Sequence, residues 1–275
     1  MNRVFLLLCL PIFLVPGDCW GQCRSCLPAT IFSWSGERSP LGELDSIATD
    51  RPDFTEASST VGLGVTQLEM GYTFASASGA ASHSWGEPLL RQGLFANWFE
   101  LRFAAAPVSV FGTGSESGFE DIYVGLKLAL TQQAGILPEV AIVPQMTVPT
   151  GGSAFSADRT LGGANLLYGW TITDEFSFGG STQFNQSVDD ALVPYDEWAQ
   201  SLTVGRSLTE ELASYLEWYA LVPVDSTGVE TSHYLNGGFT YLLSDDVQLD
   251  IRAGKGLSST SDDYFVGAGV SFRHK

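Results

Sequence analysis

Nine charged residues of this sequence could do chemistry together, because each alternates with apolar neighbours in an extended stretch. The acids are Glu69, Glu100, Asp121, Glu217 and Asp250, and the bases are Arg91, Arg102, Lys127 and Arg252. Successive side chains of a strand point to opposite sides, so all nine are expected on the polar faces of strands. Five acids against four bases predict a mixed, nearly neutral lining. Such a lining could filter solutes by size and charge, or its ion pairs could hold a closed or plugged structure.

A second charged group, residues 50–56, precedes the first alternating stretch. Its charged members are Asp50, Arg51, Asp53 and Glu56. From its charge and position we hypothesise that this segment folds into the space enclosed by the strands and pairs there with Arg102 or Arg252. It would then act as a plug.

Catalytic and metal-binding patterns are weak by comparison. Ser232 and His233 are neighbours on an expected strand, so their side chains point to opposite faces and cannot exchange a proton. His83 is expected in a loop, where a lone histidine is usually solvated. The three histidines lack the spacing of paired metal ligands. The sequence therefore predicts no enzyme, no metal site and no cofactor.

The elements that must position the nine charges are long strands, each with one apolar face and one polar face. Ile122, Val124, Leu126, Leu128 and Leu130 share one face, and Asp121 and Lys127 lie on the other. This stretch is about twice the usual strand length of roughly 5–6 residues in soluble proteins. A tilted strand that crosses a membrane needs roughly 9–11 residues. The stretch is therefore typical of a membrane-spanning β-barrel.

The same alternation recurs along the chain and predicts about twelve strands, an even number as in bacterial barrels. Residues 197–207, 212–222 and 232–242 alternate less regularly. Short connections are expected near 96–97, 131–136, 172–175, 208–211 and 243–246, and longer ones at 75–86, 105–118, 149–159, 187–196, 223–231 and 256–262. Alternating short and long connections favour an all-β, antiparallel, up-and-down barrel with both chain ends in the periplasm over a soluble sandwich.

Composition and aromatic residues agree with this interpretation. A net charge of −18 argues against nucleic acid as a partner. Aromatic residues gather near the expected strand ends, as in the girdle that such barrels place at lipid headgroups. They are Trp98, Tyr168, Trp170, Phe176, Trp198, Trp218, Tyr241 and Phe272. Outer-membrane lipid is thus the expected partner, and the sequence gives no indication of oligomeric state.

The N-terminal region is expected to direct export. Residues 1–21 combine Arg3, an apolar run over residues 4–15 and small residues at Gly17 and Gly21, which is typical of a cleaved signal peptide. Residues 22–63 are predicted to form a flexible arm before a barrel domain at 64–275. Cys23 and Cys26 fit a small disulfide of an exported protein better than a redox or zinc site.

Residues 50–56, Asp-Arg-Pro-Asp-Phe-Thr-Glu, also carry a resemblance. Together with Gln67-Leu68-Glu69 and the later Val148-Pro149-Thr150-Gly151, they resemble the outer-membrane barrel family named for the MetA pathway of phenol degradation. The resemblance runs from about Asp50 to the C-terminus. One departure is the end of the chain, because such barrels usually finish at an aromatic residue and this chain continues past Phe272 for three more residues. The resemblance implies an outer-membrane barrel and a transport role, with a hydrophobic or aromatic solute as one option.

Two functions remain open from the sequence. The first is an outer-membrane channel or transporter through which small solutes pass passively. The second is a non-conducting barrel that anchors or displays its acidic loops, including Asp189, Asp190, Asp262 and Asp263, for adhesion.

Overall fold

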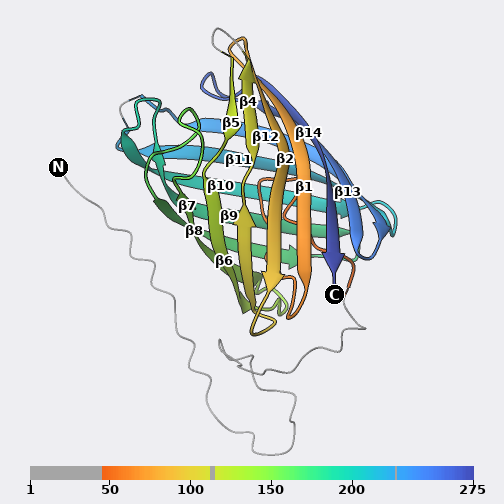
Figure 1. Cartoon of the computed structure of the whole chain (residues 1–275). Coiled ribbons are helices and arrows are strands. Elements are labelled where there is room, and N and C mark those ends of the chain that lie inside the picture. The colour runs from red at the N-terminus through yellow and green to blue at the C-terminus, as the bar shows by residue number, and fades with distance from the viewer. Residues whose placement is uncertain (1–44, 112–114, 227) are drawn as a thin grey trace, which may run out of the picture.

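The computed structural model describes residues 45–111, 115–226 and 228–275, and its strands form one antiparallel sheet that closes on itself (Figure 1). In chain order the strands are β1 (Thr66–Ala77), β2 (Ala80–Gly93), β3 (Phe99–Ala104), β4 (Pro107–Phe111), β5 (Glu116–Phe119), β6 (Ile122–Thr131), β7 (Glu139–Val148), β8 (Leu161–Thr171), β9 (Phe176–Val188), β10 (Pro194–Ser207), β11 (Leu212–Val224), β12 (Ser232–Ser244), β13 (Val247–Gly256) and β14 (Tyr264–His274). The predicted signal peptide and Cys23 and Cys26 lie outside the described residues.

The sheet closes because β1 pairs with β14 on one side and with β2 on the other. All strands except β4 and β5 belong to this ring, which confirms the predicted barrel of twelve antiparallel strands. Strands β4 and β5 form an additional hairpin. Strand β4 pairs with residues 81–84 of β2, beyond the part of β2 that pairs with β3. Within the described residues no helix is long and apolar enough to cross a membrane.

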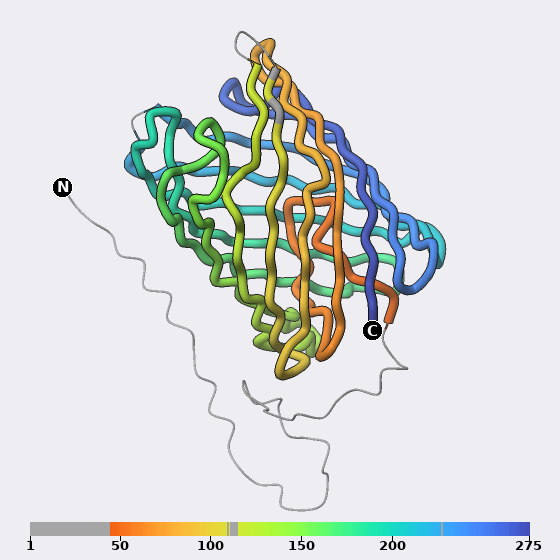
Figure 2. The backbone as a smooth tube through the Cα atoms, viewed as in Figure 1, coloured from red at the N-terminus to blue at the C-terminus, as the bar shows by residue number. Residues whose placement is uncertain are grey.

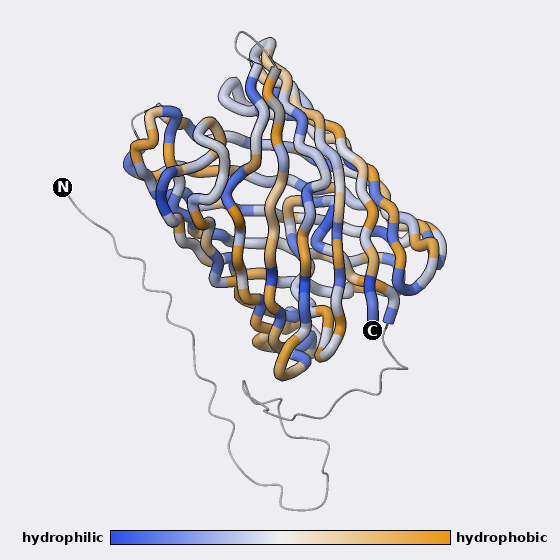
Figure 3. Tube along the Cα trace, viewed as in Figure 1, coloured by the Kyte–Doolittle hydropathy of each residue, from blue (hydrophilic) through white to orange (hydrophobic). Residues whose placement is uncertain are grey.

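The side chains alternate between the outer surface and the lumen as the sequence predicts. On β13, Leu249 and Ile251 are 40% and 56% exposed, whereas Gln248 and Asp250, which alternate with them, are buried. Figure 3 shows apolar and polar residues following one another along the strands. A membrane strand needs this pattern because lipid surrounds one face and water fills the other.

The connections at one end of the barrel differ from the prediction. Residues 75–86 were expected to be a long link, but β1 and β2 continue through them to a tight turn at Ser78 and Gly79. Both turn residues have positive φ, 49° and 85°, which matches the twist of paired strands and lets the hairpin extend. Residues 105–118, also expected to be a link, contain β4 and part of β5. The extra pairing satisfies backbone groups that a loop would leave to water.

The chain enters the barrel before it forms the first strand. Figure 2 shows the segment from residue 45 onward, coloured red to orange, running within the ring of strands. It leaves past the end of β2, where a Cβ at Gly93 would lie 1.6 Å from the carbonyl oxygen of Gly62. We name residues 45–63 the luminal segment.

A charge on the outer wall should be costly if lipid covers it. Leu216, in the middle of β11, is 58% exposed on that wall. We expect Leu216→Arg to lower the free energy of unfolding in lipid vesicles by about 2–4 kcal/mol, because the charge would enter the apolar core of the bilayer. Leu216→Phe is the control and should change stability little. Equal stability of the two variants would contradict the assignment of this face to lipid.

Candidate functional site

The centre of the lumen is a buried carboxylate surrounded by cations. Asp50 of the luminal segment lies 2.7 Å from Arg102 Nη1, 2.8 Å from Lys127 Nζ and 3.3 Å from Arg91 Nη1. It also accepts the backbone N–H of Ala57 at 2.9 Å. All three cations are at most 1% exposed. Such charges need close partners, because water cannot solvate them there.

Strand register explains why the cations meet. Arg91 of β2 and Arg102 of β3 are opposite each other, and Lys127 of β6 is opposite Glu100 of β3. Like charges in facing positions repel. Glu100 relieves this repulsion through a bidentate contact with Arg91, at 2.8 and 3.0 Å. Glu69 of β1 also contacts Arg91, at 3.1 Å. Asp50 and Glu56 add negative charge from the luminal segment.

The wall carboxylates bind the backbone of the luminal segment. Glu69 accepts the N–H groups of Asp50 and Arg51 at 3.0 Å. Glu217 accepts those of Phe54 and Thr55 at 2.8 and 2.7 Å. Glu100 accepts the N–H of Val61 at 2.9 Å. A segment outside any strand has free N–H donors, and these acids satisfy them in a buried setting.

Arg51 fixes the segment to β2 and β13. Its guanidinium contacts Glu87 at 2.6 Å and Asp250 at 3.3 Å. It lies over Gly71 and Gly269, which face each other on β1 and β14. A Cβ at either position would come within 2.4 Å of the guanidinium. The two glycines therefore create the space that this side chain occupies.

The remaining predicted residues are divided between two places. Glu56 contacts Arg102 Nη2 at 2.8 Å, and Arg252 donates to the carbonyl oxygen of Pro52 at 3.0 Å. Asp121 lies apart from the cluster, just before β6. There it accepts the N–H groups of Thr150, Gly151 and Ala157 at 3.1, 2.9 and 2.9 Å.

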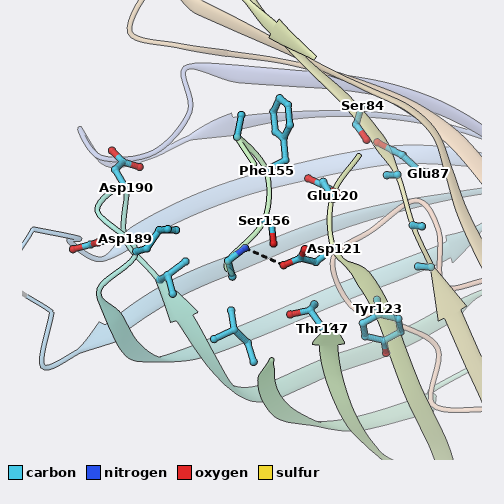
Figure 4. Close-up of a pocket in the computed structure, with 18 of the residues that line it drawn as sticks. Ser84, Glu87, Glu120, Asp121, Tyr123, Thr147, Phe155, Ser156, Asp189 and Asp190 are labelled. Carbon is cyan, nitrogen blue, oxygen red and sulfur yellow. Dashed lines mark hydrogen bonds between the residues drawn. The ribbon is translucent and has the colours of Figure 1, made fainter. Parts of the chain in front are cut away.

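Asp121 lines a cavity of about 750 Å³ at the end of the barrel that carries β4 and β5 (Figure 4). Although burial opposes ionisation, the N–H donors, led by Ala157, lower the pKa of this carboxyl group. Asp121 thus stabilises a loop at the mouth instead of joining the ion cluster. The alternation of side chains could not predict this role, because alternation holds only within a strand and Asp121 precedes β6.

Some residues of the site escaped the sequence analysis. Glu87 was not singled out, yet it contacts Arg51. Gly71 and Gly269 were not singled out either. The signal that could have identified Glu87 is the preceding Gly86, because both residues have positive φ and interrupt the strand.

The pKa values of two carboxyl groups of the luminal segment are shifted in opposite directions. Burial opposes ionisation of Asp50, but Arg102, Arg91 and Lys127 hold its pKa far below the ordinary value. Burial, together with the negative charges of Glu217 and Asp50, raises the pKa of Asp53 well above the ordinary value. Asp50 therefore favours docking of the segment when its carboxyl group is ionised. Asp53 favours docking when its carboxyl group is protonated.

Residues 49–274 match the model of a family described by the MetA pathway of phenol degradation. The chain belongs to this family. The match begins one residue before Asp50, so it includes residues 49–63 of the luminal segment, and it confirms the resemblance seen in the sequence. No curated protein matches this chain.

Solved structures share the fold of this family member. The COG4313 outer membrane channel from Pseudomonas putida F1 is 13% identical, with a TM-score of 0.63 over 82% of this chain and 99% of that one. The KdgM porin is 10% identical, with a TM-score of 0.49 over 75% of this chain and 98% of that one. The likeness to the first structure shows a shared barrel fold. The apolar outer wall is the surface that lipid requires of such a barrel.

The side chains considered for catalysis are separated in this family member. The Ser232 hydroxyl donates to the carbonyl oxygen of Thr260 at 3.4 Å. The His233 ring stacks on Trp218 with centroids 5.9 Å apart. Among the described residues, no group of three or more His, Cys, Asp or Glu side chains could hold a metal ion.

Asp50 should dominate docking of the luminal segment. We expect Asp50→Asn to weaken docking by about 3–5 kcal/mol, the usual cost of leaving buried charges without their partner. Docking can be measured as the rate at which maleimide labels a Ser59→Cys reporter, with Cys23 and Cys26 replaced by serine. Asp45→Asn, at an exposed position of the same segment, is the matched control. Equal labelling rates in the two variants would contradict the role of Asp50.

Docking should also depend on pH through Asp53. Because its pKa is raised in the docked state, docking is strongest below the ordinary pKa of an aspartate and weakens as pH rises through the raised value. Asp50 stays ionised over this range, so its ion pairs persist. Asp53→Asn should tighten docking at neutral pH and reduce the pH dependence. The rate of Ser59→Cys labelling is measured at each pH in the presence and absence of Asp53→Asn, and the ratio of the two rates reports the effect of Asp53 on docking. A ratio that is the same at every pH would refute the role of Asp53.

Proposed function

We propose that the protein is an outer-membrane channel for passive passage of small solutes, in which residues 50–56 act as a plug. The wall residues Glu69, Arg91, Glu100, Arg102, Lys127, Glu217, Asp250 and Arg252 line the lumen and hold the plug. Asp121 lines the mouth. The channel carries out no chemical step.

The observation that carries this proposal is unfilled space beside the luminal segment. A cavity of about 470 Å³ lies between the segment and the wall of β7 to β10. A second cavity, of about 400 Å³, shares Thr49, Asp53, Thr171, Ser177 and Thr203 with the first. The two spaces therefore adjoin. The segment narrows the lumen without filling it.

The distribution of side chains supports a passage on this side. The ion cluster belongs to β2, β3 and β6, whereas the facing wall presents Gly169, Ser177, Gly179 and Thr203. Small polar side chains leave room for water and hold no solute tightly. Passage requires binding weak enough for release.

A deletion tests the plug. Removing residues 22–56 should raise single-channel conductance in planar bilayers severalfold, because the segment no longer narrows the lumen. Removing residues 22–44 leaves the segment in place and is the matched control. A folded 22–56 deletion that conducts no ions would refute the channel and favour the anchor or display function. Equal conductance of the two deletions would refute only the plug.

A reversible crosslink tests the same movement within the whole chain. The Thr55 and Ser201 hydroxyl oxygens lie 2.6 Å apart, so cysteines at these positions should form a disulfide between the segment and β10. Cys23 and Cys26 are replaced by serine. Conductance should rise when the disulfide is reduced, and each single-cysteine variant serves as a control.

A further inference from the structure

An aromatic ladder runs from the luminal segment onto the barrel wall. Phe54 stacks on Tyr219 of β11 with centroids 4.5 Å apart and planes at 4°. Tyr219 stacks on Tyr234 of β12 at 4.6 Å and 11°. Phe265 of β14 follows at 6.4 Å from Tyr234. The ring of Phe265 fits because its cross-strand neighbour is Gly254, where a Cβ would lie 2.0 Å from the ring.

Arg252 lies at the end of this ladder with unused binding capacity. Its guanidinium is 5.5 Å from the Phe265 ring and donates to Pro52 O and Thr73 Oγ1, both neutral acceptors. Arg51, Arg91, Arg102 and Lys127 each have a carboxylate within 3.3 Å. Among the lumen-facing cations that the structure describes, Arg252 alone forms no ion pair, and its buried Nε has no acceptor.

The luminal segment occupies both features at once. Phe54 places a ring on Tyr219, and Pro52, two residues earlier, places a carbonyl oxygen on Arg252. A ring joined to an oxygen acceptor is also what a small aromatic acid offers. Its carboxylate would bind Arg252 more strongly than a neutral carbonyl does, because charge-assisted hydrogen bonds are about twice as strong.

We propose that the wall formed by Tyr219, Tyr234, Phe265 and Arg252 is a binding site for small aromatic carboxylates. The acid replaces the Phe54 ring on Tyr219 and the Pro52 carbonyl on Arg252. It therefore competes with the luminal segment for the wall. This inference rests on the proposed channel and names a class of solute for it.

The nearby carboxylates do not cancel the charge of Arg252. Asp250 is bound by Arg51, and Glu217 is bound by backbone N–H groups and Asn236. The contacts with Arg51, Thr55 and Asn236 persist when Pro52 and Phe54 move, and Glu217 then loses only the N–H of Phe54. Acids at the mouth, such as Glu120 and Asp121, slow the entry of an anion, but charges beyond about 8 Å are largely screened at physiological ionic strength.

The test is calorimetric binding to the folded, full-length barrel in detergent, with Phe54→Ala to vacate the slot. Benzoate is the probe. Benzamide keeps the ring and the acceptor but lacks the charge, and cyclohexanecarboxylate keeps the charge but lacks the flat ring. We expect Phe54→Ala to bind benzoate at least about tenfold more tightly than the wild type does. The variant should also bind benzoate more tightly than either analogue, by a similar factor.

A second substitution isolates the arginine. Arg252→Gln in the Phe54→Ala background should abolish the preference for benzoate over benzamide while leaving benzamide binding unchanged. Arg206→Gln is the matched control, since Arg206 lies 5.3 Å from the Phe176 ring away from the ladder, and it should have no effect. Equal binding of the three probes, or a preference that survives Arg252→Gln, would overturn the inference. Because binding is measured without conduction, either result leaves the channel to be judged by the deletions.

Discussion

The constraint on which this structure depends is that lipid tolerates only one face of each strand. Every backbone group must be paired within the closed ring, and every charge of the wall must turn inward. On β6 this rule exposes Ile122 and buries Lys127 completely. The lumen of a twelve-stranded barrel is too narrow to hydrate all these charges freely. Pairing them is therefore a requirement of the fold, before any function is considered.

The wall cannot meet that requirement by itself. Register places Arg91 opposite Arg102, and Glu100 can relieve only part of their repulsion. The luminal segment completes the network by bringing Asp50 between the cations and N–H donors to Glu69 and Glu217. A buried network of this kind says little about net stability, because desolvation offsets much of the attraction. What it determines is position, since removing any member leaves an unpaired charge.

Much of this arrangement was predictable from the sequence, and the failures have physical reasons. Period-two alternation gave the barrel, the strand number and the inward direction of eight of the nine wall charges. Asp121 was misplaced because it lies beyond the end of its strand, where loop hydrogen bonds decide direction. The hypothesis named Arg102 or Arg252 as partners of the segment. The structure places Asp50 on Arg102, Arg91 and Lys127, while Arg252 binds a backbone carbonyl that no residue pattern encodes.

The contacts of the luminal segment are unequal, and this inequality shapes how the lumen can open. Asp50 and Arg51 are held by ion pairs to Arg102 of β3 and Asp250 of β13. Pro52 is held by a hydrogen bond to its neutral carbonyl oxygen, and Phe54 is held by a ring stack and by its N–H on Glu217. The hydrogen bond of the Pro52 carbonyl and the ring stack are each worth about 1 kcal/mol, so a solute that replaces these two contacts separates no ion pair. Partial displacement around Phe54 is therefore the least costly rearrangement, and withdrawal of the whole segment requires breaking the cluster at Asp50.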